Sequence, residues 1–149
     1  MAQIYVDRTE LTIPKLLRII GQNPEEYEVW SSDETLPKQE EMEVEFSTTG
    51  QFFGYWSQVE AYFDGCGYEM LDAAVGEAYR RKYPTYDRGG VIHFGRTHLL
   101  YRPHPWSHDV CLDDDGVGGW KLRLGNQNNQ GNGDERFAVR KKMSHQSPG

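Results

Sequence analysis

The sequence predicts an α+β fold in which an N-terminal βαββ unit packs with two further helices and a C-terminal antiparallel sheet. Between residues 13 and 20 the apolar residues recur at helical spacing. Residues 41–46 alternate glutamate with apolar side chains, as a strand with one solvated face does. After Gly89 and Gly90 the chain breaks into short β-rich segments. Helices and strands mixed in this way indicate one core shared by both.

The first fifty residues supply the βαββ unit. We expect a short strand at residues 3–6 and then the helix at residues 13–20, where Pro14 suits the first turn and Gly21 suits the end. Residues 27–30 are the second expected strand, and the alternating segment is the third.

Two helices and five strands are expected in the remainder. Apolar spacing predicts a helix between residues 52 and 63, which the Gly65-Cys66-Gly67 turn ends. A second helix is expected over residues 68–83, because Pro84 lacks the N–H that would continue it. The expected strands of the C-terminal sheet are residues 91–94, 98–101, 109–112, 120–124 and 137–139.

The length of 149 residues suits a single domain over residues 1–149. Charge divides this domain into an acidic sub-unit at residues 1–54 and a sub-unit of helices and antiparallel strands at residues 55–142. A flexible tail is expected at residues 143–149. The first 64 residues hold 13 Asp and Glu against 4 Lys and Arg, and the whole chain has a net charge of −7.

Composition excludes several classes of protein. The acidic balance argues against general nucleic-acid binding, which needs a basic surface. No apolar run reaches the roughly 20 residues of a membrane span, and the N-terminus lacks the features of a signal peptide. Two cysteines are too few for a secreted disulfide scaffold. We therefore expect a cytoplasmic globular protein that does not bind membranes.

Two groups of residues are candidates for binding another protein. Glu41, Glu43 and Glu45 should share the solvated side of one strand, where they would attract a partner with a basic surface. A cluster of adjacent aromatic residues cannot all face one core, and exposed aromatic side chains commonly anchor interfaces. The members of this cluster are Phe52, Phe53, Tyr55 and Trp56.

Residues 13–53 resemble the bacterial multiubiquitin family of β-grasp, ubiquitin-like domains. The resemblance rests on LLRIIGQNPEEYEVW at residues 16–30, and on EVEF at 43–46 followed by Gly50 and the pair at 52–53. It implies a β-grasp unit and a partnership with activating and conjugating enzymes. One departure is that residues 3–11 are few for the two strands of the family's first hairpin.

Residues 104–120 are similar to the active-site stretch of ubiquitin-conjugating enzymes. There a His-Pro-Asn precedes a catalytic Cys-Leu and a downstream tryptophan, and here His104, Cys111 and Trp120 take these places. The resemblance implies that Cys111 forms a thioester. Trp106 stands where the family has the asparagine that stabilises the oxyanion, so the motif is incomplete.

Cys66 is a second candidate nucleophile, because it lies between glycines just before an expected helix, where a thiolate is favoured in thiol hydrolases. His93 or His98 would then be the base, but no third member of a triad can be assigned. The catalytic candidates are thus Cys66, Cys111, His98 and His104, and no set is complete.

Zinc is the metal that histidine and cysteine would hold together. His104, His108 and Cys111 are the closest-spaced candidates, with His93 and His98 upstream, but their spacing matches no standard ligand pair. Strand alternation would also divide them between two faces. We expect neither a metal nor another cofactor.

The function that these observations favour is a small, non-enzymatic protein-binding module, within a bacterial ubiquitin-like conjugation system. Two alternatives remain open. One is an inhibitor or immunity-type protein, of phage or bacterial origin, that uses its acidic half against a basic partner. The other is a cysteine-dependent enzyme, with a thioester at Cys111 or thiol hydrolysis at Cys66.

Overall fold

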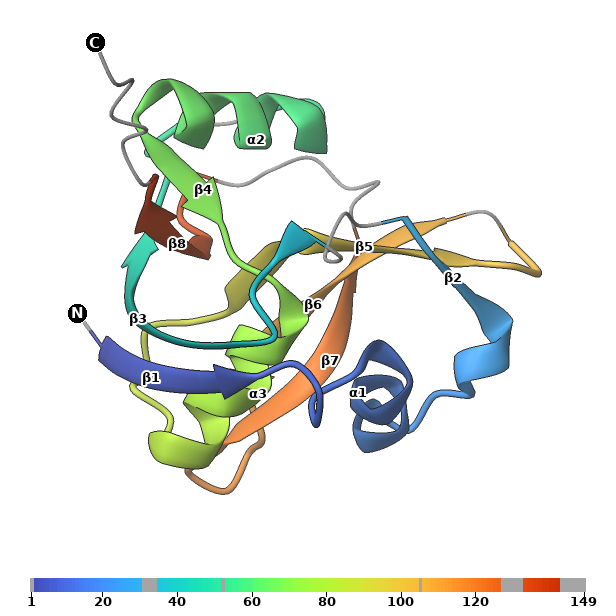
Figure 1. Cartoon of the computed structure of the whole chain (residues 1–149). Helices are drawn as coiled ribbons and strands as arrows, with labels where there is room; N and C mark the ends of the chain where they lie inside the picture. Colours follow the sequence, from blue (N-terminus) through green and yellow to red (C-terminus); the bar gives the residue numbers. More distant parts are fainter. Residues whose placement is uncertain (1, 31–34, 52, 105, 127–132, 143–149) are drawn as a thin grey trace, which may run out of the picture.

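The computed structural model describes residues 2–30, 35–51, 53–104, 106–126 and 133–142, and it has an α+β fold (Figure 1). Within these residues, eight strands form one curled sheet in the order β1-β3-β8-β5-β6-β7, with β2 beside β5 and β4 beside β8. Phe52 and the expected tail at residues 143–149 lie outside the described residues. The strands are β1 (Ala2–Asp7), β2 (Tyr27–Val29), β3 (Gln39–Ser47), β4 (Tyr68–Met70), β5 (Ile92–Tyr101), β6 (Ser107–Asp114), β7 (Trp120–Asn126) and β8 (Arg136–Lys141). The helices are α1 (Ile13–Ile20), α2 (Trp56–Gly65) and α3 (Ala73–Lys82), with a 3-10 turn at Pro24–Glu26.

Helices cover the sheet from opposite sides. In Figure 1, α2 and α3 lie on opposite sides of β4 and β8. Helix α1 lies next to α3 and β7. The main core gathers residues that face α3, such as Val44, Phe94 and Leu112, whereas Phe137 and Val139 belong to a second core under α2. Because neighbouring residues of a strand point to opposite faces, β8 contributes to both cores.

Local signals explain α1. The Thr12 side chain accepts a hydrogen bond from the Lys15 N–H at 3.4 Å, and Pro14 lies in the first turn. Gly21 ends the helix with a φ of 96°, and its N–H donates to the carbonyls of Leu17 and Arg18. The expected helix at residues 13–20 is confirmed.

The N-terminus of α3 is capped by another part of the chain. Asp72 precedes the helix, but its carboxylate accepts two hydrogen bonds of 2.9 Å from the Arg8 guanidinium instead of capping the helix. The Ala73 N–H donates to the Thr97 hydroxyl of β5 at 2.8 Å. Two residues distant in sequence, Arg8 and Thr97, therefore fix where α3 begins.

An ion-pair chain continues from Arg8 across the sheet. Arg8 also contacts Glu40 at 2.5 Å, and Arg140 of β8 contacts both Glu40, at 2.6 Å, and Glu69. Burial opposes the charge of Arg8, but its bonds to Asp72 and Glu40 raise its pKa. This chain joins β1, α3, β3, β8 and β4.

Two expectations about where elements begin and end are wrong. Residues 68–70 are the strand β4 and not the start of the helix, because Gly67 turns the chain at a φ of 82° and Met70 then pairs with Val139 of β8. Residues 91–94 and 98–101 do not form two strands but the single strand β5. Its register against β6 shifts between Phe94 and Leu99, so the interruption seen in the sequence is an irregularity within one strand.

The N-terminal elements pair with distant strands. β1 pairs with β3, but β2 pairs with β5 and β3 also pairs with β8, so these pairings do not confirm a separate β-grasp unit. The sheet is not wholly antiparallel either, because β5 and β8 run parallel where Ile92 and His93 meet Arg136 and Phe137. Among the described residues, no helix is long and apolar enough to span a membrane.

We predict that Gly95→Ala destabilises the protein by about 1–3 kcal/mol, because it overpacks the core under α2. A Cβ at Gly95 would overlap Met70 Cε and lie 2.9 Å from Trp56 Cζ2. Urea unfolding measures the change. As a control, Gly65→Ala adds a methyl group within α2 where nothing lies within 4 Å, so it should leave stability unchanged or increased by up to about 1 kcal/mol. Equal stability of the two variants would contradict this packing.

Candidate functional site

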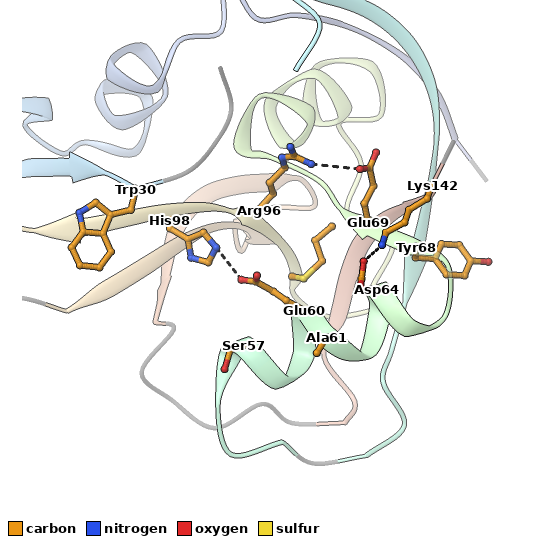
Figure 2. A pocket seen from close by; sticks show the side chains of 11 residues that line it. Trp30, Ser57, Glu60, Ala61, Asp64, Tyr68, Glu69, Arg96, His98 and Lys142 are labelled. Atoms are coloured by element: carbon orange, nitrogen blue, oxygen red, sulfur yellow. Dashed lines mark ion pairs between the residues drawn. The ribbon is translucent and has the colours of Figure 1, made fainter. Parts of the chain in front are cut away.

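A recess of about 530 Å³ lies between α2 and strands β4 and β5 (Figure 2). Successive turns of α2 line this recess with Ser57, Glu60, Ala61 and Asp64. Trp30, with 60% of its surface exposed, lies at one end beyond His98. This volume falls in the range of small-molecule sites.

Ion pairs cross this recess. His98 Nε2 lies 2.9 Å from Glu60 Oε1, so the histidine considered as a base is engaged with a carboxylate of α2. Arg96 Nη1 lies 3.5 Å from Glu69 Oε2, and Lys142 contacts Asp64 (Figure 2). The walls are therefore tied together by paired charges.

A second polar cluster is buried in the sheet under α2. His93 of β5 and Asp109 of β6 face each other, with Nδ1 2.8 Å from Oδ2, and both side chains are at least nine-tenths buried. On the other side of the ring, Nε2 lies 3.4 Å from Glu135 Oε1. Phe137 stacks on the imidazole and Trp56 meets it edge-on.

The carboxylates keep His93 charged. Burial lowers the pKa of the imidazole, but the charge of Asp109 and the bonds to Asp109 and Glu135 outweigh it, so that the pKa rises to about 9. Gly125 leaves the space for this pair, since a Cβ there would overlap Asp109 Oδ1. Sequence patterns could not reveal the pair, because it depends on the register between β5 and β6.

The two cysteines lie in different environments. Cys111 is opposite His93 in the β5–β6 register and is completely buried. Burial, and then the charge of Asp109, raise the pKa of its thiol well above the usual value, which disfavours the thiolate that a thioester carrier needs. Cys66 follows the C-terminus of α2 and is exposed. It does not precede a helix directly, because β4 intervenes before α3.

The histidines considered as zinc ligands are spread over the fold. His104 is exposed between β5 and β6, and His108 of β6 contacts the Gly125 carbonyl at 3.0 Å through Nδ1. Cys111 lies an odd number of residues along the same strand and thus on the opposite face. Within the part of the chain that the structure describes, no three His, Cys, Asp or Glu side chains form a group that could hold a metal ion.

The glutamates predicted to share one side of a strand do so. Glu41 and Glu43 of β3 are exposed and alternate with buried Met42 and Val44. Glu45 is half-buried, and its contact with the Tyr68 hydroxyl raises the pKa of that tyrosine.

The aromatic cluster is divided between core and surface. Trp56 is buried in the core under α2 and cannot reach a partner, and Phe53 packs beside that core. Tyr55 has 72% of its surface exposed. Tyr5, Trp30 and Trp106 are further exposed aromatic residues outside this cluster. Alternation of residues 3–6 could have revealed Tyr5.

The thiols should react at very different rates. We predict that iodoacetamide labels Cys66 of the native protein, whereas Cys111 reacts only after unfolding, because it is buried and its pKa is raised. Mass spectrometry of native and urea-unfolded samples measures this, with Cys66→Ser as the control that removes native labelling. Rapid labelling of Cys111 in the folded protein would contradict its placement.

Stability should depend on the protonation of His93. A group whose pKa rises on folding stabilises the protein below its unfolded pKa, here 6.5, and this contribution is lost as the pH passes about 9. We predict that His93→Gln reduces the free energy of unfolding most at pH 6.5 and less as the pH approaches 9. Urea unfolding at several pH values measures the difference in the free energy of unfolding between wild type and His93→Gln. A difference that grows with pH would show that His93 is neutral when folded.

Comparison with known proteins finds no relative: no family model, curated protein or solved structure matches this chain. Its function must therefore be inferred from its own geometry.

Proposed function

We propose that the chain is a protein-binding module whose acidic face docks against a basic surface of another protein. The acidic face consists of Gln3 and Tyr5 of β1 with Glu41 and Glu43 of β3. In the antiparallel register Tyr5 lies opposite Glu41, and Gln3 lies opposite Glu43. The observation that carries the proposal is that Tyr5, with 53% of its surface exposed, lies among these exposed carboxylates.

The chemistry of this face suits a partner rich in lysine or arginine. Tyrosine offers an apolar ring and a hydroxyl, and it loses little conformational entropy when it becomes an interface contact. Carboxylates on either side would pair with cations and accelerate association. The Gln3 amide donates to Glu43 Oε1 at 2.9 Å, which orients that carboxylate before a partner arrives.

The face is supported from behind by the main core. Ile4, Met42 and Val44 point to the opposite side of the same two strands and are buried. A surface built on packed strands loses little freedom on binding, because its backbone is already ordered. The two strands therefore present the carboxylates in a preformed arrangement.

Two roles would use this face. Its charge is suited to an inhibitor or immunity-type protein that covers a basic site on its target. The resemblance of residues 13–53 to ubiquitin-like domains instead favours a partner in a bacterial conjugation system. A role as a cysteine enzyme has less support, because Cys111 is buried and its pKa is raised.

We predict that reversing two charges, Glu41→Lys with Glu43→Lys, abolishes capture of a basic partner while the melting temperature stays within a few degrees of wild type, because exposed substitutions rarely destabilise. Tagged wild type and variant would each be incubated with lysate of the native host, and quantitative mass spectrometry would identify the proteins that the variant loses. Activating or conjugating enzymes among them would support the conjugation role, and a nuclease or toxin would support the inhibitor role.

The matched control is Glu25→Lys with Glu28→Lys, which changes the net charge equally at exposed residues on the 3-10 turn and β2. This variant should retain the partner. If both double variants capture the same proteins as wild type, or if both lose them equally, the acidic face is not the binding surface.

A further inference from the structure

Strand β1 lies at one end of the sheet, and its outer edge is open. Among the described residues, β1 pairs with β3 along one side and with no strand along the other. The N–H of Arg8 donates to the Lys38 carbonyl at 2.7 Å, which continues the register in which Val6 lies opposite Glu40. Hydrogen-bonded pairs alternate along an antiparallel ladder. The even-numbered residues of β1 therefore bond to β3, and the backbone groups of its odd-numbered residues point outward.

The chain itself uses part of this outer edge. The Gln3 carbonyl accepts a hydrogen bond from Lys82 Nζ at 2.6 Å. The Asp7 carbonyl accepts one from the Leu11 N–H at 2.9 Å. Between these two residues lies Tyr5, and within the described part of the chain neither its N–H nor its carbonyl has a hydrogen-bond partner. A strand edge with free backbone groups can pair with another chain.

The side chains beside this edge indicate the charge of a chain that would pair with it. Gln3 and Tyr5 belong to the acidic face, and Asp7 adds another carboxylate on the same side of β1. Glu41 and Glu43 lie one strand further, so they would be about 10 Å from a strand added next to β1, which is twice the usual spacing. The long, flexible side chains of lysine and arginine can reach toward carboxylates at that distance. Basic residues on this side of an added strand would therefore meet negative charge.

The other side of the edge favours uncharged residues. Helix α3 packs with Ile4 and Val6, on the face of β1 opposite to the acidic face. Tyr83 directly follows α3, and its exposed side chain places the hydroxyl 3.4 Å from the Gln3 carbonyl. Lys82 Nζ lies 5.5 Å from the centre of the Tyr83 ring, so a cation is already present there. Apolar residues on this side of an added strand could contact the ring without charge repulsion.

We propose that an extended, basic segment of the partner protein adds to β1 as an antiparallel strand, with lysine or arginine at alternate residues on the acidic face. This inference rests on the proposed function, because it names the part of the partner that the acidic face binds. Tyr5 would exchange two backbone hydrogen bonds with the residue opposite it, whose side chain would lie on the acidic face. A second copy of the chain lacks this chemistry, since β1 contains an aspartate and no lysine or arginine.

The probe for this proposal is the acetylated and amidated peptide Thr-Lys-Val-Lys-Val-Lys-Thr. In the antiparallel arrangement its lysine N–H groups face β1, and its valine N–H groups face away. N-methylation of the last two lysines should weaken binding to the whole chain at least about tenfold, because it removes two donors and places methyl groups against the edge. The matched control is N-methylation of the two valines, which should change the affinity by less than about threefold. Calorimetric titration at low salt measures the three affinities.

Hydrogen exchange provides a readout that charge attraction alone does not change. In the free protein the amide of Tyr5 should exchange faster than those of Ile4 and Val6, which bond to β3. Bound peptide should slow the exchange of the Tyr5 amide at least about tenfold, because that N–H gains an acceptor. Two-dimensional NMR spectra recorded during exchange into D₂O measure the three rates.

Lys82 tests the same edge from the side of the protein. Its ammonium group occupies the Gln3 carbonyl and repels basic side chains, so Lys82→Met should strengthen binding of the peptide by about threefold. The matched control is Lys121→Met, which removes one positive charge at an exposed residue of β7 and should leave the affinity nearly unchanged.

The outcomes separate this inference from the proposed function. If Glu41→Lys with Glu43→Lys abolishes peptide binding while both methylated peptides bind as tightly as the parent, the acidic face binds a basic segment without the edge of β1, and only the inference is overturned. A greater loss with the methylated valines, or an unchanged exchange rate of the Tyr5 amide, would also overturn it. So would failure of the parent peptide to bind, with or without self-association of the chain, whereas the capture experiment would still decide the proposed function.

Discussion

Strand β8 is the element on which the rest of this structure depends, because three other strands pair with it. β3 lies along one side, while β4 and the start of β5 share the other, so that Val139 faces both Glu45 and Met70. Phe137, Ala138 and Val139 are all completely buried, since α2 covers one face of β8 and the main core covers the other. Without β8, strands β1 and β3 would not pair with the remainder of the sheet, and the core under α2 would lose the side chains of Phe137 and Val139.

The ion-pair chain from Asp72 through Arg8, Glu40 and Arg140 to Glu69 runs along this junction. Buried ion pairs contribute little net stability, because desolvation offsets their attraction, but removing one member leaves another charge unpaired. In this protein the ion pairs help to define the register of β3 against β8. A slip of β3 relative to β8 would move Glu40 away from Arg140, so this ion pair favours the observed register.

Sequence patterns predicted the elements whose signals are local. Thr12, Pro14 and Gly21 delimit α1, and the alternation around Val44 predicted both β3 and the exposed glutamates. β4 could not be predicted, because three residues carry no period and become a strand only where β8 offers free backbone groups. The same limit applies to the His93–Asp109 pair. The two residues lie 16 positions apart, and nothing in either segment specifies the register that brings them together.

The late position of β8 in the chain has a consequence for biosynthesis. Until residues 136–141 have left the ribosome, β3, β4 and β5 expose the backbone groups that β8 will bind, and open strand edges of this kind recruit other chains. Contacts between residues so distant in sequence also form slowly. The pairings of β3, β4 and β5 with β8 must therefore form after residues 136–141 have been translated, whereas β5, β6 and β7 can pair with one another earlier.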